Sequence, residues 1–135
     1  MHRADDSPHI LVVEDEADVQ QLITFVLERA GYAVTCVSGR SEAEAAIFLH
    51  DFDAAVIDLC LPDGRGDQIV RLLRSQSPET RIVVTSAFAH SSLILQHASE
   101  SGDAFVTKPF RNVDLIAALA PVVVTTVVQS AEVGC

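Results

Sequence analysis

The chain has 135 residues, 49% of them apolar and 21% charged, which fits one globular domain with a substantial core and leaves no room for a second. Its formal net charge of −10 argues against binding to nucleic acid or an anionic membrane, since either surface would repel it, whereas a divalent cation would be attracted. The three cysteines (Cys36, Cys60, Cys135) show no zinc or redox spacing and residues 1–8 lack a secretory signal, so we expect reduced thiols and a cytoplasmic location.

The first third of the chain predicts a strand, an acidic loop and a helix. Residues 1–8 are polar and are predicted to form a disordered leader. The apolar run His9–Val13 predicts a buried strand, and it stops at the three consecutive acids Glu14–Glu16. From Ala17 onward apolar residues recur every three or four positions until Gly31, which predicts an amphipathic helix that ends at this glycine.

The next segment predicts a second strand and helix and then a third strand. Tyr32–Val37 alternates as a strand does, and Ser41 followed by Glu44 suggests a capping box for a helix that runs to about His50. The third strand, Phe52–Ile57, leads directly into Asp58. The turn-forming residues after Asp58 then change the direction of the chain.

The second half of the chain continues the alternation of helices and strands. The predicted elements are a helix around Ile69–Leu73 that ends before Pro78, a strand at Arg81–Thr85, a shorter helix around Leu93–Ala98, a strand at Ala104–Thr107 and a helix at Asp114–Ala120. Residues 121–135 form an apolar tail that contains the β-branched run Val122–Val128, so an extra strand, a continued helix or a dimer contact are all open interpretations. The run is too short to span a bilayer.

Five strand–helix units with short connections predict an α/β fold, in which a doubly wound, five-stranded parallel sheet carries helices on both faces. In such a fold the carboxyl ends of the strands share one edge, and ligands bind there. That edge should collect three carboxylates, one hydroxyl and one amine: Glu14, Asp15, Asp58, Ser86 and Lys108. Asp58 taken alone could equally be a loop residue that caps the next helix.

The clustered carboxylates predict a Mg²⁺ site. Acids held close together repel one another, and a hard cation with oxygen ligands removes the repulsion while leaving room for phosphate oxygens. Lys108 is the only lysine in the chain, and arginine supplies the other positive charges. A compact ammonium directly after a strand suits a phosphate oxygen better than it suits a solvent-exposed surface.

Four motifs in order make the chain resemble the receiver domains of two-component response regulators. They are Glu14–Asp15, Asp58 with the turn through Gly64, Ser86–Ala87, and Lys108–Pro109–Phe110. The spacing of Asp58, Ser86 and Lys108 is also usual for that family. The resemblance covers residues 10–119, places a receiver domain at residues 9–120, and implies the flavodoxin-like strand order 2-1-3-4-5.

The resemblance also implies a role for each residue of the site. Asp58 would accept a phosphoryl group from a sensor histidine kinase or a histidine phosphotransfer protein. The Mg²⁺ ligands would be Asp15, Asp58 and the backbone carbonyl of Cys60, with Glu14 acting through water. Lys108 and the Ser86 hydroxyl would contact the phosphoryl oxygens. The protein would thus promote its own phosphorylation and dephosphorylation without being a turnover enzyme.

A switch is implied as well. Ser86 would move toward the phosphate, and Phe105 would enter the vacated space, although Phe105 could equally be a core residue. The readout face would consist of the fourth helix, the fifth strand and the fifth helix. We expect a single-domain regulator or phosphorelay protein that acts on a downstream protein target, with homodimerisation as a further possibility and no contact with nucleic acid or membrane.

Two positions and two alternatives stay open. Cys60 and Phe88 place apolar groups beside the expected acyl phosphate, which predicts slow hydrolysis and a long-lived phosphorylated form. The main alternative function is a Mg²⁺-dependent phosphatase of the haloacid-dehalogenase type. That chemistry needs a second acid two residues after the nucleophile, where this chain has Cys60. A degenerate receiver used only for docking is the other alternative.

Overall fold

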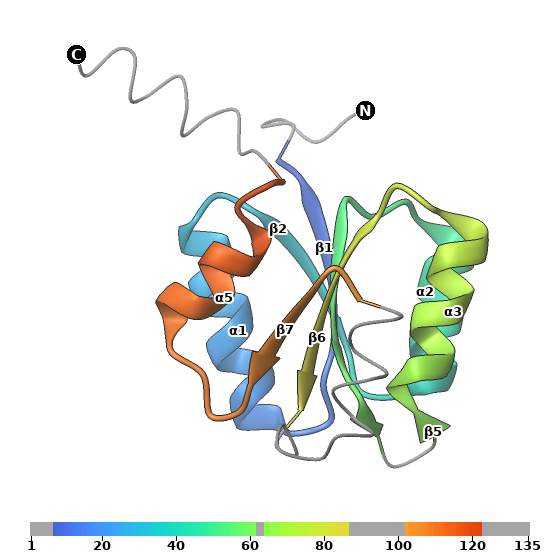
Figure 1. Ribbon diagram of the computed structural model, residues 1–135, viewed down its shortest axis with the longest axis horizontal. Coiled ribbons are helices and arrows are strands. Elements are labelled where there is room, and N and C mark those ends of the chain that lie inside the picture. Colours follow the sequence, from blue (N-terminus) through green and yellow to red (C-terminus); the bar gives the residue numbers. More distant parts are fainter. Residues whose placement is uncertain (1–6, 62–63, 87–101, 123–135) are drawn as a thin grey trace.

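A five-stranded parallel sheet forms the centre of the protein. The computed structural model describes residues 7–61, 64–86 and 102–122. The strands of the sheet are β1 (His9–Val13), β2 (Ala33–Val37), β3 (Ala54–Asp58), β6 (Arg81–Ser86) and β7 (Ala104–Thr107). Their order is β2-β1-β3-β6-β7, and every neighbouring pair is parallel (Figure 1). Both the fold class and the strand order predicted above are confirmed.

The register of the sheet brings the carboxyl ends of its strands to one edge. Val13 lies opposite Ile57 across β1 and β3, and Asp58 lies opposite Thr85 across β3 and β6. Ser86 likewise lies opposite the last residue of β7. Residues that directly follow these strands are therefore delivered to the same edge.

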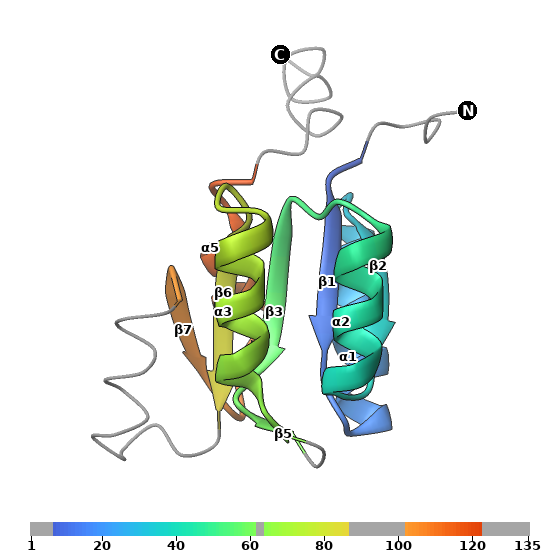
Figure 2. The same cartoon turned by 90° about the vertical axis from the view of Figure 1, so that its right-hand side faces the viewer.

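Among the residues that the structure describes, two pairs of helices cover the two faces of the sheet. Helices α1 (Ala17–Arg29) and α5 (Asn112–Leu119) lie on one face, and α2 (Arg40–Leu49) and α3 (Gly66–Gln76) lie on the other (Figures 1 and 2). Successive residues of the central strands point to opposite faces, so each face has its own buried apolar cluster. One cluster includes Leu11, Ala55, Ile57 and Ile69, and the other includes Ile10, Val12, Val56 and Leu115.

Some predicted boundaries were wrong, for local reasons. Helix α2 begins at Arg40 after an extended Gly39, so Ser41 lies inside the first turn and does not cap the helix. The carboxylate of Glu42 instead accepts a hydrogen bond from the Ser38 backbone N–H at 2.7 Å. The third strand begins at Ala54, two residues later than predicted, and it includes Asp58.

One element was not predicted. After Asp58 the chain forms a short antiparallel pair, β4 (Cys60–Leu61) with β5 (Gly64–Arg65). The pair leads straight into α3, and the Gly66 backbone N–H donates to the Leu59 carbonyl at 2.9 Å. The described residues after Asp58 therefore fold back next to the end of β3.

Several predictions fall on residues that the structure does not describe. They are the fourth helix around Leu93–Ala98, Phe88, most of the leader and nearly all of the tail. Within the described parts of the chain, every helix is too short or too polar to cross a lipid bilayer.

Tyr32, the only tyrosine of the chain, fixes the end of α5 and offers a direct test of the packing. Its hydroxyl donates to the carbonyls of Leu119 at 3.3 Å and Val122 at 2.9 Å, and burial raises the pKa of the phenol above its ordinary value of 10.0. A raised pKa means that the neutral phenol stabilises the fold below pH 10, and that this stabilisation is lost as the pH rises through the folded-state pKa.

A spectroscopic titration of tyrosinate should therefore give a midpoint above that of free tyrosine. Tyr32→Phe should remove the signal and lower stability by about 1 kcal/mol. A midpoint at the free-tyrosine value would contradict the buried contact.

Candidate functional site

The carboxyl edge of the sheet carries a compact group of acids. Glu14 follows β1 directly, and Asp58 is the last residue of β3; their exposed fractions are only 1% and 5%. Asp15, the next residue after Glu14, is exposed. One oxygen from each of the three carboxylates lies within 4.8 Å of the others. The predicted clustering of Glu14, Asp15 and Asp58 is thus present.

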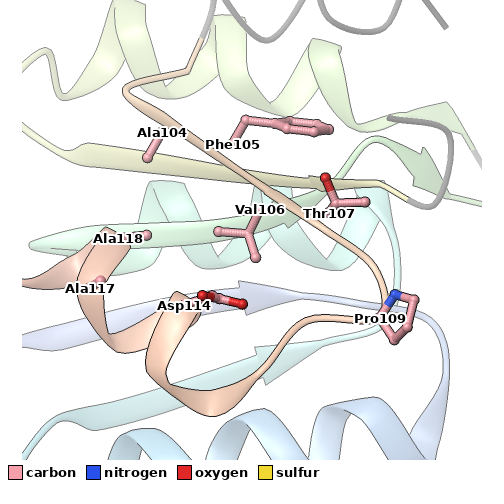
Figure 3. A pocket seen from close by; sticks show the side chains of 8 residues that line it. All are labelled: Ala104, Phe105, Val106, Thr107, Pro109, Asp114, Ala117 and Ala118. Carbon is pink, nitrogen blue, oxygen red and sulfur yellow. The ribbon is translucent and has the colours of Figure 1, made fainter. Parts of the chain in front are cut away.

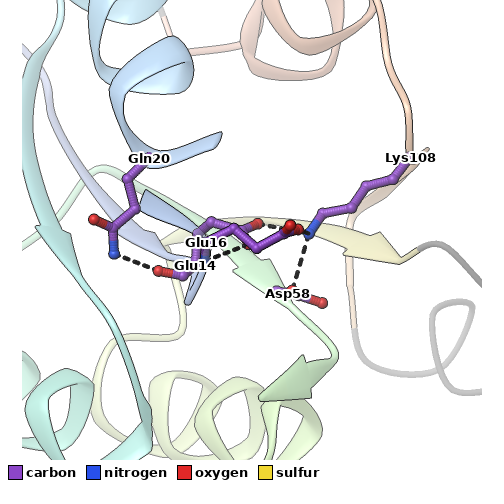
Figure 4. Close-up of polar contacts among 5 residues, drawn as sticks. All are labelled: Glu14, Glu16, Gln20, Asp58 and Lys108. Carbon is purple, nitrogen blue, oxygen red and sulfur yellow. Dashed lines mark hydrogen bonds and ion pairs between the residues drawn. The ribbon is translucent and has the colours of Figure 1, made fainter. Parts of the chain in front are cut away.

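Lys108 reaches this acidic group from the end of β7. Its Nζ lies 2.7 Å from Glu14 Oε1 and donates a hydrogen bond to Asp58 Oδ2 at 3.0 Å (Figure 4). Glu16 Oε1 is more distant, at 3.9 Å. The peptide bond that joins Lys108 to Pro109 is cis. The single lysine of the chain therefore bridges the two buried carboxylates, a contact that was not predicted, while its role toward a phosphoryl group stays a prediction.

Burial and charge oppose each other at this bridge. Burial raises the pKa of the Glu14 carboxyl, and it outweighs the hydrogen bonds from Lys108 and from the Glu16 backbone, which favour the ionised form. Burial also acts to lower the pKa of the Lys108 ammonium, but the hydrogen bonds and charges of Glu14 and Asp58 together raise it above its ordinary value of 10.5. Lys108 is consequently charged at neutral pH, and it is the group that compensates the acids.

The end of β3 is fixed by a close backbone approach that sequence reasoning missed. Gly66, the first residue of α3, packs directly against the backbone of Asp58. A Cβ atom at this position would lie 2.1 Å from the Asp58 carbonyl oxygen and 3.0 Å from Ile57 Cγ2. Only a glycine fits here without a shift of the chain. A glycine at the start of a strongly amphipathic helix was the available signal.

The remaining predicted site residues lie at or near the same edge. Ser86 ends β6, is fully buried, and its carbonyl accepts a hydrogen bond from the Lys108 backbone N–H at 3.0 Å. Cys60 lies in β4, two residues beyond Asp58; its side chain, like Phe88, falls outside what the structure describes. The described geometry therefore brings Ser86 next to Lys108 through the backbone.

Phe105 lies in the middle of β7, further from the edge. It projects to the opposite side of the strand from Val106 and packs against the apolar cluster beneath α2 and α3 (Figure 3). Phe105 also borders an open groove of about 560 Å³ along β7 and α5, together with residues that include Pro109, Asp114 and Ala117. The residue is thus partly core and partly accessible, and its role as a switch stays a prediction.

The donor atoms of the acidic group fit a Mg²⁺ ion. Mg²⁺ prefers hard oxygen ligands and is held in proteins by one or two carboxylates with water and phosphate oxygens in the remaining positions. If all three acids are ionised, one ammonium leaves two negative charges uncompensated, which a divalent cation would balance. The exposed Asp15 keeps the group open to solvent, so water and a phosphoryl group can reach a bound ion.

The family of the chain follows from comparison with known proteins. Residues 10–120 match the model of the response regulator receiver domain. The chain belongs to this family. The match extends over the strands and helices that build the acidic edge, and it favours the receiver interpretation over the haloacid-dehalogenase alternative. Receiver domains are the phosphorylated modules of two-component systems, so the acidic group corresponds to the phosphorylation-site cluster of the family.

Relatives and solved structures agree with this assignment. The receiver domain is 30% identical to a probable transcriptional regulatory protein, TcrX of Mycobacterium tuberculosis, over 99% of this chain and 58% of that protein. The chain spans about half the length of the other curated relatives that it matches. A CheY-like receiver domain from Methylobacillus flagellatus is 27% identical, with a TM-score of 0.79 over 87% of this chain and 100% of that one. TrrA of Thermotoga maritima, solved in complex with Mg²⁺-BeF, is 24% identical, with a TM-score of 0.77 over 86% of this chain and 99% of that one, and it shares the fold.

Proposed function

We propose that this receiver domain accepts a phosphoryl group on Asp58 in a Mg²⁺-dependent reaction. The observation that carries the proposal is the position of Asp58: a buried carboxylate at the ligand edge, within 4.8 Å of two further carboxylates and 3.0 Å from the only lysine of the chain. Glu14 shares these neighbours, with Lys108 at 2.7 Å, so what singles out Asp58 is that it alone occupies the phosphoacceptor position in the motif by which the chain resembles receiver domains. Asp58 is also held in place by the close approach of Gly66 to its backbone.

Glu14, Asp15 and Asp58 are the side chains that would hold the cation, with the Cys60 carbonyl as a further ligand. When bound, Mg²⁺ neutralises charge on the phosphoryl oxygens and aligns them for in-line transfer. The TrrA structure, with Mg²⁺ and a beryllium fluoride in a receiver of the same fold, supports this choice of metal. Glu14, which Lys108 contacts at 2.7 Å, would contribute mainly through water and charge.

The transfer itself needs little from the protein beyond positioning. An oxygen of Asp58 attacks the phosphorus of a phosphohistidine on the partner, a P–O bond forms, and the P–N bond breaks with its electron pair returning to the imidazole. In the structure, Lys108 binds Asp58 and Glu14. After transfer, its ammonium would donate a hydrogen bond to one of the new phosphoryl oxygens. The buried hydroxyl of Ser86 would donate to another of these oxygens.

The partners and the readout follow from the same chemistry. The phosphodonor would be a sensor histidine kinase or a histidine phosphotransfer protein, and the phosphorylated form would act on a downstream protein target from the cytoplasm. Movement of Ser86 toward the phosphate would let Phe105 shift inward and alter the surface around β7 and α5, where the groove lies. The acyl phosphate would be hydrolysed at the same site, and slow hydrolysis stays the prediction that the sequence makes from Cys60 and Phe88.

Phosphorylation by a small-molecule donor tests the proposal without a partner protein. With acetyl phosphate and Mg²⁺, intact-mass spectrometry should show the addition of one phosphoryl group to the wild-type chain and none in EDTA. Asp58→Asn should abolish the addition, because an amide oxygen is a poor nucleophile. Asp18→Asn, which removes an exposed acid in the first turn of α1, should behave as wild type. Mg²⁺-dependent labelling of Asp58→Asn equal to that of the wild type would reject the assignment.

A further inference from the structure

The Gln20 side chain connects the acidic loop to the neighbouring loop after β2. Its Nε2 donates to the backbone carbonyl of Glu14 and, at 3.2 Å, to the hydroxyl oxygen of Ser38 (Figure 4 shows the first contact). Gln20 lies in the first turns of α1, on the side that faces the end of β1. Both hydrogens of the amide are thereby used, and both acceptors belong to loops at the ligand edge.

These contacts complete a frame around Asp15. The Glu14 backbone N–H donates to the Val37 carbonyl at 3.1 Å, and the Glu16 backbone N–H donates to Glu14 Oε2 at 3.2 Å. The Gln20 backbone N–H in turn donates to the Glu16 carbonyl at 2.9 Å. Gln20 therefore binds the residue before Asp15 with its side chain and the residue after Asp15 with its backbone. Asp15 itself is exposed, and the frame holds the backbone on either side of it.

We propose that Gln20 is a positioning residue for the cation site, which it serves by holding the backbone on either side of Asp15 so that the Asp15 and Glu14 carboxylates converge with Asp58. The inference rests on the proposed Mg²⁺-dependent function of the same site. In this role Gln20 would bind neither the cation nor the phosphoryl group. Gln20 acts by ordering the acidic loop before the cation binds. Without Gln20, part of the binding free energy of the cation would be lost in ordering the loop.

Replacing Gln20 by glutamate separates positioning from charge. Gln20→Glu keeps the size of the side chain but removes both donors, and it sets a carboxylate against the Glu14 carbonyl. Added negative charge near the site would by itself tighten Mg²⁺ binding, whereas a disordered acidic loop weakens it. The two effects have opposite signs. Gln21 is the matched control, because it is the same residue type one position further on, it is exposed, and Gln21→Glu adds the same charge without removing the frame.

Two measurements on the full chain decide the matter, one without metal and one with Mg²⁺ alone. In EDTA, amide hydrogen exchange should become faster across residues 14–20 in Gln20→Ala and Gln20→Glu and stay unchanged in Gln21→Ala, while circular dichroism shows the fold retained. In calorimetric titration with Mg²⁺, the dissociation constant should rise about fivefold in Gln20→Ala, which corresponds to about 1 kcal/mol, and by a smaller factor in Gln20→Glu, where the added charge offsets part of the loss. Gln21→Glu should leave it unchanged or lower it.

Each result bears on one claim. Unchanged exchange and unchanged or tighter Mg²⁺ binding in Gln20→Glu would overturn the role of Gln20, even if Asp58 is phosphorylated normally. Loss of the fold in both Gln20 variants would also overturn it, because Gln20 would then be a structural residue of the whole domain. A third outcome separates the two proposals: the wild type shows slower exchange of the acidic loop and tighter Mg²⁺ binding than the Gln20 variants, but it takes up no phosphoryl group. This result would support the role of Gln20 and reject the proposed function.

Discussion

Gly66→Ala is expected to destabilise the domain and to impair phosphorylation together. The new methyl carbon would lie 2.1 Å from the Asp58 carbonyl oxygen, so either α3 or the end of β3 must shift. Overpacking of this kind costs about 3 kcal/mol, which for a domain of this size lowers the melting temperature by roughly 10 °C. The shift falls on the residue that carries the acceptor carboxylate, and a displacement of about 1 Å at a reacting group costs on the order of a hundredfold in rate.

Thermal unfolding and the rate of labelling by acetyl phosphate measure the two effects of Gly66→Ala. Gln76→Ala, at an exposed position near the end of the same helix, is the control and should change neither. The labelling rate is compared at a temperature where circular dichroism shows both proteins folded. If the alanine variant melted like the wild type and were labelled as fast, the close approach of Gly66 to Asp58 would be wrong.

Lys108→Met is expected to leave two buried carboxylates without their common cation. Glu14 and Asp58 are 1% and 5% exposed, and the Lys108 ammonium is the charge that lies between them. Removing one partner of a buried ion pair is strongly destabilising; because water reaches the rim of this site we expect about 2 kcal/mol at neutral pH. Mg²⁺ should recover part of this loss, since the cation binds the same carboxylates.

The pH dependence of this loss has a definite sign. The pKa of Lys108 is raised in the folded protein, so its stabilising contribution is complete below its ordinary value of 10.5 and disappears as the pH rises through the folded-state pKa. At the acid end, the raised pKa of Glu14 lets this carboxyl take up a proton early, which removes the uncompensated charge in the variant. The difference in free energy of unfolding should therefore be largest from neutral pH to about pH 10 and should shrink on both sides.

Denaturant unfolding of the wild type and Lys108→Met across this pH range tests the prediction in EDTA. The control is Arg111→Met, which breaks an exposed ion pair with Asp114 in the same segment and should change stability far less than Lys108→Met does. A difference that stayed constant from acid to alkaline pH would show that Lys108 acts through packing and not through its charge.

The sequence was sufficient to predict the sheet and the gathering of the acids. Apolar runs that end in polar residues define the strands, and in a parallel sheet their carboxyl ends must meet at one edge. Glu14, Asp58 and Lys108 are therefore neighbours although they lie far apart along the chain. The functional roles of Ser86, Phe105 and Cys60 came from the family resemblance, and they stay predictions.

Other parts of the site depend on the path of the backbone in space. The approach of Gly66 to the Asp58 carbonyl follows from how the β4–β5 pair folds back, and short strands with a turn between them carry little periodicity. Gln20 contacts a backbone carbonyl, which any residue at position 14 would offer, so no side-chain pattern points to the contact. The start of α2 was wrong because the helix begins at Arg40 after an extended Gly39, and the Glu42 carboxylate accepts a hydrogen bond from the Ser38 backbone N–H just before the helix.

Mapping the phosphoryl group tests the central claim most directly. The wild-type chain is labelled by acetyl phosphate in Mg²⁺, the acyl phosphate is reduced with borohydride to a stable homoserine, and the peptides are sequenced by mass spectrometry. We predict that the reduced residue is Asp58, that its yield falls to background in EDTA, and that Glu14 and Asp15 stay unmodified. Modification at another carboxylate, or equal modification of Asp58 without divalent cation, would contradict the account.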